Sequence, residues 1–214
     1  MKYFYFFLWG IVVLFGFYSL TGIAFFKWSA YQTTHPKAAF QIIDNGNNEI
    51  TIVDFTNYRC GYCKQMHSTV KETLSLQKNI RYVPRPILFG DNQLSNEDNP
   101  QIQKPYPLEQ LVMAAGIQGK FEEMHNMFME YPDGSIPEEL IKETANLYGI
   151  DYDKMVEDAQ SERVQKYLDD NISDMLGYKI QTIPSYIING TTYTISDTLP
   201  TLQNILSAVE AEKK

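Results

Sequence analysis

Cys60 and Cys63 are the residues of this chain that most clearly suggest chemistry, and they are its only cysteines. Gly61 and Tyr62 separate them, so the two sulfurs are close enough in the chain to close a small disulfide ring. If a helix begins at the first cysteine, its unpaired N–H groups and the positive end of its dipole favour a thiolate there. Two cysteines cannot build a stabilising disulfide framework, so this pair predicts redox chemistry.

An acidic residue accompanies the cysteine pair. Asp54 lies six residues before Cys60, at the end of a predicted strand. A carboxylate there would lie under the start of the helix, near the second sulfur. If it is buried, its pKa is raised and it can take or give the thiol proton. The alternative interpretation is a solvated carboxylate at a strand end.

The elements that position these residues are predicted from residues 50–67. An apolar strand covers 50–55, a short polar loop covers 56–59, and a helix starts at Cys60. The helix is indicated by residues that fall near one face, namely Cys63, Met66, Val70 and Leu74.

Two sequence stretches carry a resemblance to a known family. The stretch VDFTNYRCGYCK, ending at Lys64, resembles the active site of the thioredoxin superfamily. Far downstream, TIPSYIING (182–190) is similar to the cis-proline loop and hairpin of the bacterial DsbA family of disulfide oxidoreductases. The resemblance runs from about residue 40 to about residue 209. It implies an α/β, thioredoxin-like fold with an inserted helical lid.

The resemblance also implies roles for individual residues. Cys60 is expected to be the exposed nucleophile, and Cys63 the buried partner that resolves mixed disulfides. Pro184 matches the family's cis-proline, which packs against the disulfide. The chain departs from the family pattern in carrying isoleucine rather than threonine before this proline, which leaves partner preference open. The residues expected to contact substrate are Gly61, Tyr62 and Ile183.

His67 follows Cys63 by one helical turn and has three interpretations. It could tune the thiolate, complete a Cys60/Cys63/His67 half-site for zinc, or be a partly exposed helix residue. A structural zinc site needs four ligands, and the other histidines, His35 and His125, lie in distant segments. The third interpretation is therefore favoured, and no metal or cofactor is predicted.

Periodicity and turn signals predict the remaining elements. These are a strand over 38–43, a strand over 80–88, a loop over 89–107, lid helices over about 108–177, a hairpin over 186–195 and a last helix over 202–209. Because proline cannot donate to a ladder, Pro84 and Pro86 predict that the second of these strands is irregular or ends early.

The N-terminus predicts a membrane anchor. Residues 3–26 carry no charge and are almost entirely apolar, which is long enough to span a bilayer. A cleaved signal peptide is the alternative, with Gly22-Ile23-Ala24 as a passable cleavage site. The expected organisation is an anchor or uncleaved signal over 1–28, a tether over 29–37 and a thioredoxin-like domain over 38–214.

The chemistry also suggests a location. Disulfide chemistry suits an oxidising compartment, so we expect a single-pass protein of the bacterial inner membrane whose C-terminal domain lies in the periplasm or otherwise outside the cytoplasm. Charge does not decide the orientation, because Lys2 and Lys27 flank the apolar segment evenly. The net charge of −8 and the pI of about 4.9 argue against nucleic acid as a partner.

Together these features predict a thiol:disulfide oxidoreductase that acts on exported, cysteine-containing proteins. A membrane redox partner would recycle the cysteine pair. A disulfide donor is favoured, because the lid resembles that of monomeric oxidases and only a short tether precedes the fold. An isomerase or reductase is the alternative, since Gly61-Tyr62 resembles the dipeptide of the bacterial isomerases. A non-catalytic thioredoxin-fold binding module and a metal carrier are alternatives of other classes.

Overall fold

The computed structural model describes residues 22, 31, 33–44, 50–88, 107–132, 135–194, 207 and 210. Its strands are β1 (Ile43–Asp44), β2 (Ile50–Thr56), β3 (Ile80–Pro86), β4 (Ser185–Ile188) and β5 (Thr191–Thr194). Its helices are the short 3₁₀ helix η1 (Ala39–Gln41), α2 (Gly61–Leu76), α3 (Leu108–Ile117), α4 (Phe121–Glu130), α5 (Glu138–Tyr148), α6 (Tyr152–Ala159) and α7 (Glu162–Gly177).

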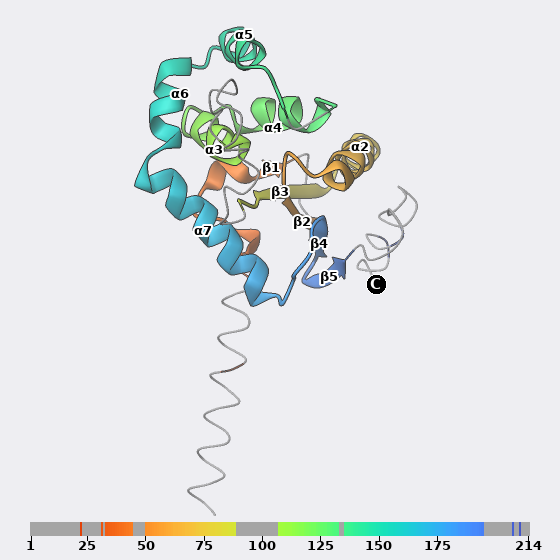
Figure 1. Ribbon diagram of the computed structural model, residues 1–214. Helices are drawn as coiled ribbons and strands as arrows, with labels where there is room; N and C mark the ends of the chain where they lie inside the picture. The colour runs from red at the N-terminus through yellow and green to blue at the C-terminus, as the bar shows by residue number, and fades with distance from the viewer. Residues whose placement is uncertain are drawn as a thin grey trace, which may run out of the picture.

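The strands form one sheet in the order β1-β3-β2-β4-β5, shown in Figure 1. β2 and β3 are parallel, and α2 is the crossover between them, whereas every other pair is antiparallel. β2 lies at the centre and is buried along almost its whole length. The cysteine helix therefore starts just after the end of the central, buried strand.

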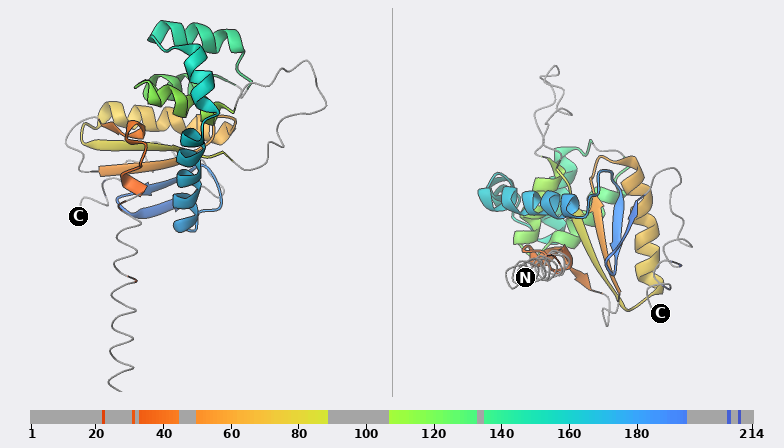
Figure 2. Two further views of the ribbon diagram at one scale, coloured as in Figure 1. Left: turned by 90° about the vertical axis from the view of Figure 1, so that its left-hand side faces the viewer. Right: turned by 90° about the horizontal axis from the view of Figure 1, so that it is seen from below.

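Different helices cover the two faces of the sheet, as the two views of Figure 2 show. Because side chains alternate along a strand, Ile50 and Ile52 of β2 face α2 and pack with its Met66 and Val70. The opposite face packs with Met175 of α7 in a separate cluster. Each face thus has its own apolar core.

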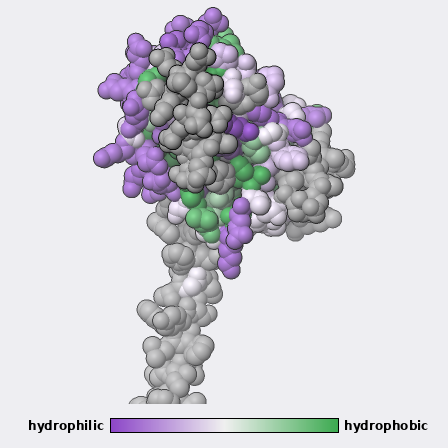
Figure 3. All heavy atoms as spheres, viewed as in Figure 1, coloured by the Kyte–Doolittle hydropathy of each residue, from purple (hydrophilic) through white to green (hydrophobic). Residues whose placement is uncertain are grey.

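α3 to α6 form a lid beyond the β1 and β3 side of the sheet (Figure 1). The lid has a core of its own, which contains apolar residues from α3, α4, α5, α6 and α7. Tyr58 and Cys63 belong to this lid core and not to either sheet core. The redox segment is therefore packed between the sheet and the lid. Hydrophilic side chains cover much of the outer surface of the lid (Figure 3).

The predicted strand over 38–43 is wrong. The chain forms η1 there, and only two residues, Ile43 and Asp44, pair with β3. The side chain of Gln41 is buried and donates a hydrogen bond to the Pro84 carbonyl at 3.0 Å. A side chain therefore takes the place that a longer β1 would fill.

β3 ends at Pro86, two residues before the predicted end at 88, so it ends early as predicted, but it is not irregular, because it pairs with β2 continuously from Ile80 to Pro86. β1 reaches only as far as Tyr82, so β3 has an open edge at Pro84 and Pro86. A missing N–H costs little at an open edge. The free carbonyls of that edge accept from Gln41 and from Asn171 of α7, each at 3.0 Å.

The other predicted elements have different outcomes. The helices between 108 and 177 are present, and β4 and β5 form the predicted hairpin around Asn189 and Gly190, both at positive φ. Apart from residue 207, the last helix over 202–209 lies outside the described residues, and so does nearly all of the loop over 89–107. So does the predicted anchor over 3–26, apart from Gly22. Within the part that is described, no helix combines the length and apolarity needed to cross a membrane.

Candidate active site

Cys60 and Cys63 form a disulfide at the start of α2, with their Cα atoms 5.2 Å apart. Cys60 is the N-cap residue, and its Sγ accepts a hydrogen bond from the backbone N–H of Cys63 at 3.1 Å. A sulfur in this position receives a helix-terminal N–H and faces the positive end of the dipole, both of which stabilise a thiolate.

The two sulfurs differ in access. Cys63 is 1% exposed, whereas Cys60 is only partly buried. Gly61 and Tyr62 are exposed beside them, and Tyr62 projects 63% of its surface to solvent. An incoming thiolate can therefore approach Cys60 and not Cys63.

The Ile183–Pro184 peptide bond is cis. Pro184 is buried, and Ile183 is half-buried and packs against the lid core that contains Cys63. The loop that precedes β4 therefore packs against the core to which Cys63 belongs, with Ile183 partly open to solvent. Ile183 and Pro184 are the two residues that the downstream motif over 182–190 indicated as site residues.

Asp54 is buried inside β2, with 1% of its surface exposed, so it is not a solvated strand-end carboxylate. It lies on the face covered by α2, and its Oδ2 accepts a hydrogen bond from the Tyr82 hydroxyl at 2.7 Å. Burial raises the pKa of Asp54 to about 7, although the Tyr82 hydrogen bond lowers it. The carboxyl can therefore change its protonation state near neutral pH.

The lid contributes residues that the sequence analysis missed. Glu109, in the first turn of α3, is 3% exposed, and its Oε1 accepts a hydrogen bond from the Tyr58 backbone N–H at 3.2 Å. The Tyr58 hydroxyl in turn bonds His125 Nδ1 of α4 at 2.9 Å. A sequence signal for Glu109 exists, because it is the single acidic residue in the otherwise largely apolar run 108–117.

Lys64 joins the cysteine helix to the lid directly. Its Nζ donates to the carbonyls of Phe128 and Tyr131, at 2.5 and 2.8 Å. These carbonyls belong to the C-terminal end of α4, where a cation is favoured. Lys64, the residue after Cys63, thus caps the C-terminal end of α4 with its ammonium group.

The interpretation of His67 as a partly exposed residue is wrong. His67 is 4% exposed, and its ring meets the buried ring of His125 at a centroid distance of 5.1 Å. Burial lowers the pKa of His67 to about 4, so the ring is neutral at physiological pH. The sequence could not show this, because His125 lies in a distant segment that folds over the helix.

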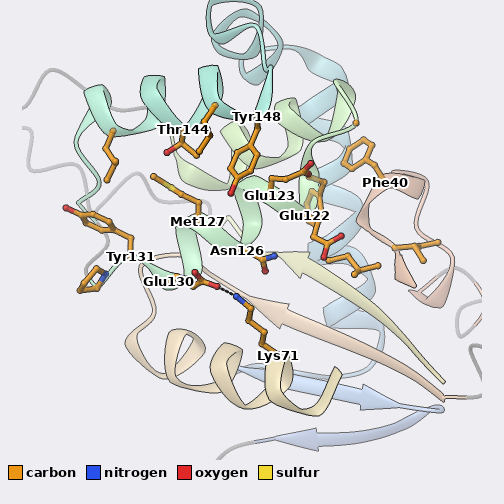
Figure 4. A pocket seen from close by; sticks show the side chains of 17 residues that line it. Phe40, Lys71, Glu122, Glu123, Asn126, Met127, Glu130, Tyr131, Thr144 and Tyr148 are labelled. Carbon is orange, nitrogen blue, oxygen red and sulfur yellow. Dashed lines mark hydrogen bonds and ion pairs between the residues drawn. The ribbon is translucent and has the colours of Figure 1, made fainter. Parts of the chain in front are cut away.

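No cluster of three or more histidine, cysteine, aspartate or glutamate side chains suited to a metal ion occurs among the described residues. A cleft of about 890 Å³ lies between α4, α5 and the η1 segment, shown in Figure 4. Met127 and Tyr148 line it, and the Lys71–Glu130 ion pair crosses one end. Neither cysteine lines this cleft, so it is separate from the redox pair.

Comparison with known proteins agrees with this geometry. The chain matches the family described as DSBA-like thioredoxin domain over residues 51–207. Its fold is similar to the catalytic domain of Proteus mirabilis ScsC, with a TM-score of 0.66 and 16% identity over 86% of this chain and 94% of that one. It is also similar to the thiol-disulfide exchange protein α-DsbA2 of Wolbachia pipientis, with a TM-score of 0.62 and 17% identity over 86% and 94%.

A curated protein is related in sequence as well. The Na⁺/H⁺ antiporter NhaA 1 of Salinispora arenicola is 26% identical over 143 residues, which are 66% of this chain. The matching region makes up only 20% of that antiporter's length, so the chain spans about one fifth of this relative.

Proposed function

We propose that this chain, which belongs to the family of DSBA-like thioredoxin domains, donates its Cys60–Cys63 disulfide to exported proteins. The family match and the intact cysteine pair make it a protein thiol:disulfide oxidoreductase. The observation that carries the donor direction is the position of Cys60 as N-cap, where its sulfur accepts the Cys63 N–H. An environment that stabilises the Cys60 thiolate stabilises the reduced form and makes the disulfide a better oxidant.

The transfer takes place in two exchange steps. A client thiolate attacks the accessible Cys60 Sγ, a mixed disulfide forms, and Cys63 leaves as a thiolate. A second client thiolate then attacks the client sulfur of the mixed disulfide. The client gains a disulfide, Cys60 leaves as a thiolate, and the cysteine pair holds the two electrons that the client has lost.

Asp54 is assigned the proton transfer that accompanies these steps. The Cys63 sulfur leaves into a site that is 1% exposed, where a bare thiolate is costly. A buried carboxyl with a pKa of about 7 can donate a proton to that thiolate and recover it when the disulfide is rebuilt. Tyr62, which is exposed two residues after Cys60, and Ile183, which is half-buried beside the lid core, are assigned to contact the client chain.

The experiment that tests the donor role is a redox equilibrium of the full-length chain with glutathione buffers. A reduction potential near about −120 mV is expected for a disulfide donor, and a value near about −270 mV would identify a reductant and overturn the donor role. An intermediate value would favour an isomerase. Cys60→Ser must abolish client oxidation in every case, and retained function in that variant would favour the binding module.

A membrane anchor and a location outside the cytoplasm belong to this proposal. The support is the uncharged apolar run over 3–26. Alkaline extraction of membranes from cells that express the full-length chain should leave it in the pellet. Protease added to spheroplasts should digest its C-terminal domain. Release of a shortened chain into the soluble fraction would instead show cleavage of the segment as a signal peptide.

A further inference from the structure

We propose that Glu109 is a positioning residue for the redox reaction. It holds the loop that leads into Cys60 from the lid side, and its negative charge limits how strongly the Cys60 thiolate is stabilised. The inference rests on the proposed function, because it concerns the reduction potential of the same cysteine pair. It does not depend on whether the protein acts as donor, isomerase or reductase.

The first support is the contact itself. Glu109 belongs to α3, and its buried carboxylate accepts the backbone N–H of Tyr58, two residues before Cys60. Asn57 fixes the same loop internally, since its Oδ1 accepts the Arg59 N–H at 2.9 Å and its carbonyl accepts the Cys60 N–H at 3.1 Å. The loop is therefore held from one side by its own turn and from the other side by the lid.

The second support is the distribution of charge. Arg59 immediately precedes Cys60, and Lys64 immediately follows Cys63, so two cations bracket the redox pair. Both interact electrostatically with Glu109. A carboxylate among these cations reduces the positive potential at Cys60, because its interaction with a thiolate is repulsive. Burial raises the pKa of Glu109, whereas the Tyr58 N–H and the two cations lower it.

The alternative explanation is an ordinary helix-end role, because acidic residues in a first turn stabilise a helix through its dipole. The chain offers a matched control for this role. Glu139 occupies the second position of α5, as Glu109 does in α3, and each helix has a proline as its N-cap residue. Glu139 is exposed and belongs to the outer part of the lid.

The experiment compares Glu109→Gln with Glu139→Gln in the full-length chain. Glutamine keeps the acceptor oxygen for Tyr58 and removes only the charge. We expect Glu109→Gln to lower the pKa of the Cys60 thiol, measured by the pH dependence of its alkylation by iodoacetamide. The glutathione equilibrium should move at least threefold toward the reduced protein, which is about 14 mV at 29.6 mV per tenfold change. Glu139→Gln should leave both values within 1.5-fold of the wild type.

Equal values for the two variants would overturn the proposal and leave Glu109 a structural residue. If Glu109→Gln does not fold, the wild-type chain gives the answer by linkage. The carboxyl of Glu109, followed by ¹³C NMR, should titrate at higher pH in the reduced protein than in the oxidised protein, because a thiolate disfavours a neighbouring carboxylate. The same titration in both redox states would overturn the proposal.

These outcomes are distinct from those that test the donor role. The donor role depends on the absolute potential of the wild-type couple, whereas the role of Glu109 depends on a difference between variants. If the wild-type couple is strongly reducing and the Glu109→Gln couple is at least threefold more oxidising than it, the donor role is rejected and the role of Glu109 is supported.

Discussion

Residues of helix α2 contact two different parts of the molecule. Met66 and Val70 pack in an apolar core of the sheet and are called the sheet side here. Cys63, which belongs to the lid core, and Lys64 and His67, which contact α4, are called the lid side. The sheet side fixes where the helix lies, and the lid side sets the electrostatic environment of the sulfurs. Stability and redox chemistry should therefore respond to different substitutions.

Met66→Ala tests the sheet side and should have the largest effect on stability. Met66 is 1% exposed, so its truncation leaves a cavity and should lower the free energy of unfolding by about 2–5 kcal/mol. The glutathione equilibrium should stay within twofold of the wild type. Urea denaturation measures the free energy of unfolding, and Gln65→Ala at an exposed neighbouring position is the control. A tenfold change in the redox equilibrium would show that sheet-side substitutions affect the redox chemistry as well as the stability.

Asp54→Asn is the polar exception on the sheet side. The wild-type carboxyl keeps its proton in the folded chain up to a pH of about 7, whereas in the unfolded chain it loses the proton near its ordinary pKa of 3.8. The free energy of unfolding therefore falls as the pH rises through this window, by up to about 4 kcal/mol. Asparagine cannot ionise, so the variant should be about as stable as the wild type near pH 4 and more stable by up to that amount above pH 7.

Denaturant titrations at several pH values check this prediction, with Asp44→Asn on the exposed edge strand as the control. Asp54→Asn should also slow client oxidation at neutral pH, because the Cys63 thiolate loses its proton donor. A constant stability difference across the pH range would show that the Asp54 carboxyl does not titrate as the structure implies.

The sheet side was largely predictable from the sequence, because its signals are local. The apolar residues within 50–55 predicted β2, and the spacing that includes Met66 and Val70 predicted α2. Asn189-Gly190 predicted the hairpin. The strand over 38–43 failed because a buried side chain, Gln41, bonds the edge of β3 in place of backbone. β3 ends early at Pro86, as its prolines predicted, but it is not irregular, because those prolines lie where β1 has already ended.

The lid side was not predictable in the same way. His67 packs against His125, and the Tyr58 loop is held by Glu109; these partners lie 58 and 51 residues further along the chain. The spacing of residues within the cysteine helix cannot indicate partners that lie in other segments of the chain. The family resemblance supplied the cysteines and the proline, whereas the charges that surround them depend on how this particular lid packs.

His67→Leu tests the lid side through its pH dependence. The folded chain keeps His67 neutral down to a pH of about 4, whereas the unfolded chain takes up the proton near 6.5. The free energy of unfolding of the wild type therefore falls as the pH drops through this window, by up to about 3 kcal/mol. Leucine should remove this part of the acid sensitivity. His35→Leu, at an exposed position, is the matched control for the loss of a histidine. An unaltered slope in His67→Leu would contradict the burial of this ring.

Lys64→Met should have the smallest effect on stability and the most informative effect on chemistry. Methionine keeps most of the hydrocarbon chain and removes the ammonium donor from the carbonyls of Phe128 and Tyr131, at a cost of about 2 kcal/mol. Because a cation beside the pair is lost, the glutathione equilibrium should move toward the oxidised protein, opposite to Glu109→Gln. Lys71→Met is the matched control, since Lys71 lies on the same helix and pairs with the exposed Glu130. It should cost less than about 1 kcal/mol. If both lysine variants move the equilibrium equally, general surface charge and not the lid contact controls the thiolate.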